Sequence, residues 1–69
     1  MDALIETIME QYNEYDAKLK IVEKEIVRKY KNNEDYSEDV IDAKDIKMMK
    51  TECILMMNRQ IISKLKTNR

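Results

Sequence analysis

The chain has 69 residues, of which 39% are charged, and its formal net charge is −1. A chain of this length has room for one domain, residues 1–69, and its core is small enough that we expect help from a partner or a second copy. One cysteine and no histidine exclude a disulfide within the chain and an ordinary zinc site, and the balanced charge excludes a large field of one sign.

Glycine and proline are both absent. The sequence therefore has no glycine to adopt a positive φ in a tight turn, and no proline to end a helix. Two long helices with one connection are the natural consequence, and we expect an all-α fold.

The apolar residues of the first half recur at alternating steps of three and four, which is the heptad pattern of a helix packed along one seam. They are Ile5, Ile8, Tyr12, Tyr15, Leu19, Val22 and Ile26. We expect this helix to run from about residue 2 to about residue 31. Leu4, Met9 and Tyr30 widen the apolar stripe at its ends, which favours a helix in a bundle.

The heptad pattern stops at residues 32–36, where we expect a turn. Asn32 and Asn33 are residues that tolerate the left-handed conformation at a helix end. Asp35 stands at capping-box spacing from Glu38, and Ser37 is an alternative N-cap for a second helix over about 37–67. A single continuous helix is the rival structure, because no glycine or proline forbids it.

Each predicted helix begins with acidic residues and ends with basic ones, so each complements its own dipole. Folding the two helices back to back places an acidic start beside a basic end at both extremities. A parallel arrangement would place like charges together. The charges therefore predict an antiparallel two-helix hairpin, and they select direction rather than supplying stability.

The second predicted helix has more apolar surface than one seam can use. One side should pack against the first helix, and it carries Ala43, Ile46, Cys53, Ile54, Met57, Ile61 and Leu65. A second line repeats every seven residues and points well away from the first: Ile41, Met48, Leu55 and Ile62, with Met49 and Met56 beside it. A contiguous apolar patch on so small a protein marks an interface.

We expect this second line to be covered by another polypeptide. Two copies of the hairpin could associate through the second helix into a four-helix bundle, as a homodimer. A larger protein could instead offer a groove to the same line, and methionines suit a surface that adapts its shape. A misplaced helix boundary, or a third packing within the chain, would remove the need for either partner.

The sequence offers no catalytic machinery. Two helices enclose no substrate cleft, so we expect no enzyme activity, no cofactor and no small-molecule substrate. Glu38, Asp42 and Asp45 are interpreted as a solvated first turn, and Cys53 as a buried, inert thiol. We therefore predict a protein–protein interaction module, such as a small inhibitor or adaptor.

A nucleic-acid-related protein is the alternative. Basic residues are concentrated in the second half of the first helix: Lys18, Lys20, Lys24, Arg28, Lys29 and Lys31. They could contact phosphates, or the acids of the second helix could imitate phosphates, although Glu23 and Glu25 interrupt the bases and no nucleic-acid-binding motif is present.

The cellular setting is inferred from composition. The lone thiol, and a start without the basic and apolar regions of a signal peptide, predict an intracellular, cytoplasmic protein, and no apolar run approaches the length of a membrane span. Abundant Asn, Lys, Ile, Met and Tyr indicate an AT-rich genome, and a compact protein without a catalytic site suits a phage or a virus.

Overall fold

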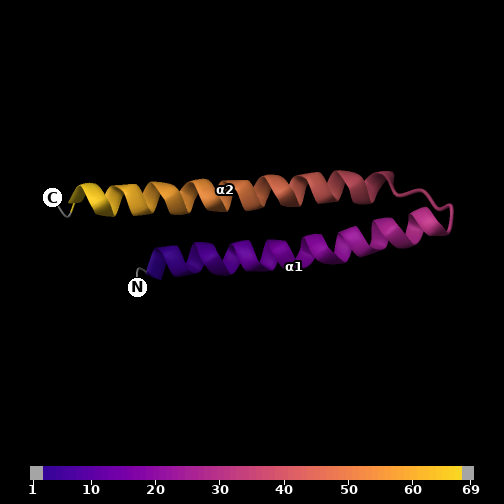
Figure 1. Ribbon diagram of the computed structural model, residues 1–69, viewed down its shortest axis with the longest axis horizontal. Coiled ribbons are helices and arrows are strands. Elements are labelled where there is room, and N and C mark those ends of the chain that lie inside the picture. The colour runs from indigo at the N-terminus through magenta and orange to yellow at the C-terminus, as the bar shows by residue number, and fades with distance from the viewer. Residues whose placement is uncertain (1–2, 68–69) are drawn as a thin grey trace.

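The computed structural model describes residues 3–67, and two helices account for most of them. Helix α1 spans Ala3–Lys31 and helix α2 spans Ser37–Thr67. The chain reverses direction between them, so the helices lie side by side and run antiparallel (Figure 1). The continuous single helix is therefore excluded. The start predicted for the first helix, at residue 2, lies outside the described residues.

The two helices form one layer. The Cα trace measures 58 × 16 × 12 Å, and its radius of gyration is 16.4 Å. A compact domain of 69 residues has a radius of gyration of about 11 Å. The difference arises because no segment of residues 3–67 folds over either face of the helix pair.

Helix α1 ends in a Schellman motif. The N–H of Glu34 donates to the carbonyl of Lys29 at 2.8 Å, and the N–H of Asn33 donates to the carbonyl of Tyr30 at 3.3 Å. Asn33 has a φ of 58°, the left-handed conformation that this motif needs at the residue after the cap. An asparagine thus supplies what glycine supplies in most such helix ends, as the sequence predicts.

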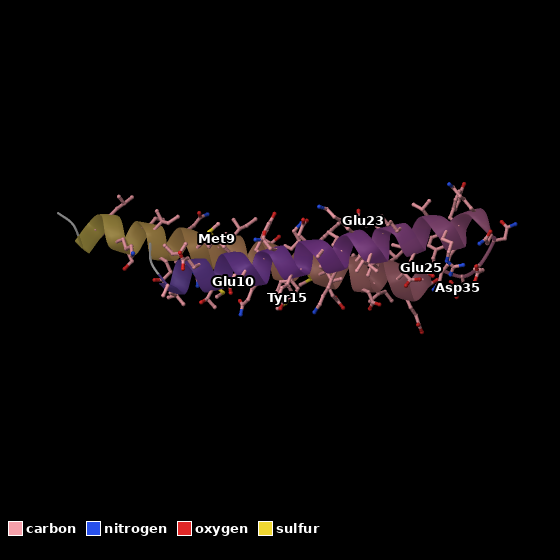
Figure 2. All side chains as sticks on the ribbon, turned by 90° about the horizontal axis from the view of Figure 1, so that it is seen from below. Met9, Glu10, Tyr15, Glu23, Glu25 and Asp35 are labelled. Atoms are coloured by element: carbon pink, nitrogen blue, oxygen red, sulfur yellow. The ribbon has the colours of Figure 1, made fainter. Side chains whose placement is uncertain are left out.

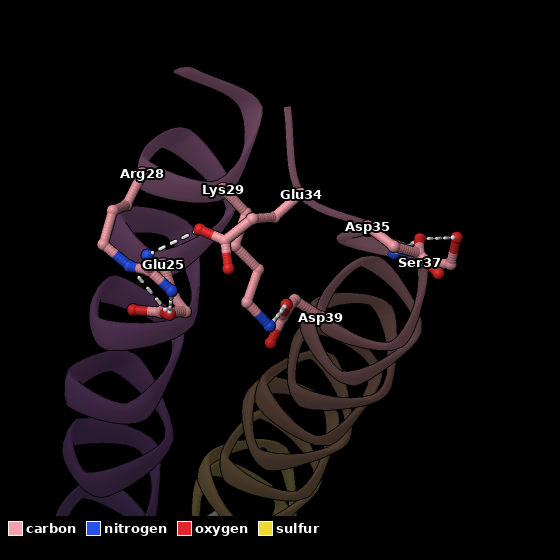
Figure 3. Close-up of polar contacts among 7 residues, drawn as sticks. All are labelled: Glu25, Arg28, Lys29, Glu34, Asp35, Ser37 and Asp39. Carbon is pink, nitrogen blue, oxygen red and sulfur yellow. Dashed lines mark hydrogen bonds and ion pairs between the residues drawn. The ribbon is translucent and has the colours of Figure 1, made fainter. Parts of the chain in front are cut away.

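Helix α2 begins with a cap from Asp35. The Asp35 carboxylate accepts hydrogen bonds from the backbone N–H and the hydroxyl of Ser37, at 3.0 and 2.6 Å (Figure 3). These two bonds hold the pKa of Asp35 below its ordinary value. The cap differs from the predicted capping box, because Asp35 bonds the residue two positions on rather than Glu38.

Ion pairs close the loop end of the hairpin. Arg28 pairs with Glu25 on α1 and with Glu34 in the turn, the latter at 2.8 Å, and Lys29 reaches across to Asp39 of α2 at 2.7 Å (Figure 3). The bond to Asp39 raises the pKa of Lys29. The Tyr30 and Tyr36 rings meet edge to face, with centroids 6.3 Å apart, so the turn has an apolar contact as well.

The seam of α1 is the predicted one. Ile8 and Leu19 are buried, and the five other predicted seam residues, Ile5, Tyr12, Tyr15, Val22 and Ile26, are half-buried. The residues at both core positions of the heptad therefore face α2.

The seam of α2 differs in part from the prediction. Ala43 and Cys53 are buried and Ile46 and Met57 are half-buried, as expected. Three of the predicted seam residues are exposed instead: Ile54, Ile61 and Leu65. Lys50 and Gln60 lie half-buried in the seam.

The correction has a geometric cause. Steps of three and four from Ala43 reach Ile46, Lys50, Cys53, Met57 and Gln60, and each of these faces α1. Ile54 and Ile61 follow seam positions by one residue, which turns them about 100° away from α1. Leu65 lies near the C-terminal end of α2, which extends past the start of α1 (Figure 1).

Candidate interaction surface

The candidate surface is the line of α2 residues at seven-residue spacing, Ile41, Met48, Leu55 and Ile62, which we call the α2 stripe. All four side chains are exposed, as are the neighbouring Met49 and Met56, with exposed fractions between 40% and 66%. A repeat of seven residues is nearly two full helical turns, so the four stripe residues share one side of α2. That side lies opposite the seam, and α1 leaves it uncovered.

The exposed surface of the single chain is large for its mass. Its accessible area is 5733 Å², whereas a compact monomer of 8.3 kDa exposes about 4,600 Å². The excess is about 1,100 Å², which exceeds the ~800 Å² that each partner contributes to a standard interface. The elongated single layer accounts for this excess, because the outer sides of both helices are uncovered within residues 3–67.

Exposed apolar residues are also present on α1, but they are scattered. One of them, Met9, lies on the same edge of α1 as the charged Glu23, and the charged Glu25 lies on the other edge (Figure 2). Ile21 and Val27 are exposed by 69% and 51%, and they are six residues apart, which places them on different sides of the helix. Helix α2 alone carries large aliphatic residues at a regular repeat on its outer side.

A polar cluster at mid-hairpin joins the two helices. Lys50 of α2 donates to the carboxylate of Asp16 on α1 at 2.8 Å, and Lys20 reaches the other oxygen of this carboxylate at 3.2 Å. The Lys50 ammonium also lies 5.1 Å from the centre of the Tyr12 ring, in cation–π geometry. The lysine side chain is only 18% exposed, so its aliphatic stem fills the seam while its charge is paired.

Charge pairing shifts the pKa values of Asp16 and Lys50. Hydrogen bonds from Lys50 and then Lys20 lower the pKa of Asp16, and the bond to Asp16 raises the pKa of Lys50. Sequence reasoning missed this cluster because Lys50 is polar. The signal was present in its position, four residues after Ile46 and three before Cys53, which is the heptad spacing of the seam.

Half of the six basic residues that could contact nucleic acid form ion pairs within the hairpin. Lys20, Arg28 and Lys29 each form an ion pair with a carboxylate. Of the acids near the start of α2, Asp39 is the partner of Lys29 and Asp35 is the helix cap. Pairing therefore reduces the positive charge that the bases of α1 present to an outside ligand.

Other kinds of site have less support in residues 3–67. A shallow open groove between the helices is lined by apolar and charged residues, Glu23, Ile26, Val27, Val40, Ala43, Lys44 and Lys47. The described residues contain no cluster of cysteine and acidic side chains placed to hold a metal ion. Cys53 is a free thiol and is 4% exposed.

Comparison with protein-family models, with curated proteins and with solved structures finds no match to the chain. Neither helix in residues 3–67 combines the length and apolar character that crossing a membrane requires.

Proposed function

We propose that this hairpin is a non-catalytic protein–protein interaction module that acts by burying the α2 stripe against another polypeptide chain. The observation that carries the proposal is the regular row of exposed aliphatic residues opposite the α2 seam. An apolar row on one side of a helix is the feature used in helix-to-helix and helix-in-groove recognition.

The partner is a second copy, a larger protein, or both. Two copies joined through α2 would form a four-helix bundle, and a larger protein held by the stripe would make the chain an inhibitor or an adaptor. The proposal places the protein in the cytoplasm, where a lone thiol stays reduced. A phage or viral source remains the compositional expectation.

The test is a double substitution of the stripe, Leu55→Glu with Ile62→Glu. Both side chains are about half exposed in the single chain, so the helix tolerates the change, whereas a carboxylate buried in an interface is costly. The matched control is Ile21→Glu with Val27→Glu, which makes the same chemical change at exposed sites on α1.

Solution mass is measured by light scattering over a concentration series, and each variant is used to capture proteins from a cell extract. We expect the stripe variant to lose self-association or capture, by roughly a hundredfold or more, while the control keeps both. Unchanged helicity by circular dichroism shows that both variants fold. The proposal is refuted if the wild type keeps the mass of one chain and captures the same proteins as the stripe variant.

A further inference from the structure

A row of charges follows the α2 stripe along its length. Five charged residues recur every seven positions: Glu38, Asp45, Glu52, Arg59 and Lys66. All five are exposed, and within residues 3–67 none of them forms an ion pair. We call this row the charged line.

The charged line and the α2 stripe are neighbours on the helix surface. Each of its last four members follows a stripe residue by four positions, as Asp45 follows Ile41 and Arg59 follows Leu55. Residues four apart on a helix lie one above the other on the same face. A helix packed on the stripe would therefore have the charged line at the edge of its contact.

The signs along this line are ordered. The three members nearest the start of α2 are acidic and the last two are basic. In a parallel two-fold pair the charged lines of the two helices would lie on opposite flanks of the contact and would not meet each other. Against an antiparallel copy, the acidic part would meet the basic part, so the line is complementary to itself in one direction only.

One register satisfies both the stripe and the charged line. If Ile41 lies opposite the partner's Ile62, then Met48 lies opposite the partner's Leu55. The same alignment brings Asp45 to the partner's Arg59 and Glu38 to the partner's Lys66. Glu52 meets its own copy near the two-fold axis, where it is the one like-charge contact.

We propose that a second copy of this chain occupies the α2 stripe, with the two α2 helices antiparallel about a two-fold axis near Thr51 and Glu52. This inference rests on the proposed function and names its partner. Because the stripe lies opposite the seam, the two α2 helices become the central pair and each α1 stays outside with its seam contacts intact. This pairing therefore gives a row of four helices rather than a four-helix bundle around one shared core.

Charge reversal across the dimer tests the direction. Asp45→Arg places two arginines together, Arg59→Asp places two aspartates together, and two-fold symmetry repeats each clash. The double variant Asp45→Arg with Arg59→Asp restores opposite charges in the antiparallel dimer alone. Glu10→Arg and Lys24→Asp are the matched controls, because both are exposed residues of the outer helix α1.

Dissociation constants are measured by sedimentation equilibrium on the full chain at low and high salt. Each single variant should weaken the dimer about tenfold at low salt, and the double variant should return to within about threefold of wild type. The controls should match wild type, and high salt should reduce the differences because these charges are exposed.

Two results would overturn the inference in different ways. A wild type that stays at the mass of one chain excludes the second copy, and it leaves the proposed function to be judged by whether the stripe substitutions change capture of other proteins. A wild-type dimer whose single variants are unchanged, or whose double variant fails to recover, excludes the antiparallel α2 pairing.

Discussion

Substitution of Leu19 by alanine probes the seam that holds the hairpin together. Leu19 is 6% exposed at the middle of α1, and it is one of four buried residues in the described part of the chain. Leucine-to-alanine changes in cores cost about 2–5 kcal/mol. The seam between two helices has open flanks that let neighbours and water fill the space, so we expect the lower part of that range, about 2–3 kcal/mol.

That loss is large for this chain. Domains have a stability of roughly 0.05–0.15 kcal/mol per residue, which amounts to about 3–10 kcal/mol here. A loss of 2–3 kcal/mol should lower the Tm by about 8–24 °C, since each kcal/mol shifts a domain of this size by about 4–8 °C. At the low end of the stability range, the substitution would remove most of the free energy of unfolding.

The matched control is Ile21→Ala, two residues further along the same helix. Ile21 is 69% exposed, and surface substitutions stay within about 0.5 kcal/mol. Alanine also has the higher helix propensity, which adds a few tenths of a kcal/mol in favour of the variant. Removal of aliphatic carbons is thus compared at a packed and an unpacked position of one helix.

Urea denaturation followed by far-UV circular dichroism measures both variants at one fixed protein concentration, because self-association would make stability depend on concentration. The expected order is wild type close to Ile21→Ala, with Leu19→Ala well below. If Ile21→Ala costs as much as Leu19→Ala, then α1 does not face α2 through the Leu19 side and the packing described above is wrong.

Three further predictions concern charge, the turn and the thiol. The lowered pKa of Asp16 stabilises the fold above the ordinary aspartate pKa of 3.8, and this contribution is lost as the pH falls through the lower folded value. Asp16→Asn should therefore shrink the acid-induced loss of stability seen in pH-dependent urea titrations. Asn33→Ala should destabilise the hairpin by about 1 kcal/mol, because at a φ of 58° alanine lacks the short polar side chain with which asparagine tolerates the left-handed conformation. Asn33→Gly, which removes the Cβ, should be neutral or better in the same assay. Cys53 should react with a thiol reagent slowly when folded and rapidly in concentrated urea, and equal rates would contradict its burial.

The sequence by itself determined the helices and their break. A heptad that runs from Ile5 to Ile26 and then stops leaves one consistent apolar face on α1, and the structure buries that face. Asn33 at the end of α1 and Asp35 before α2 are local signals, because the backbone conformations that they support depend on neighbouring residues alone. Acidic starts and basic ends predicted the antiparallel direction, which the Lys50–Asp16 and Lys29–Asp39 pairs reflect.

Only the tertiary structure decided which side of α2 meets α1. Large apolar residues lie on several sides of α2, so periodicity does not rank the sides. Apolar character alone predicts Ile54 and Ile61 in the seam, although both are exposed. Contacts made across the hairpin select the side that carries Ala43, Lys50 and Cys53, since the small residues allow close approach and Lys50 reaches Asp16. Lys50 is stabilised in the seam by Asp16, which is 34 positions away in the chain. The spacing of apolar residues within α2 contains no information about that partner.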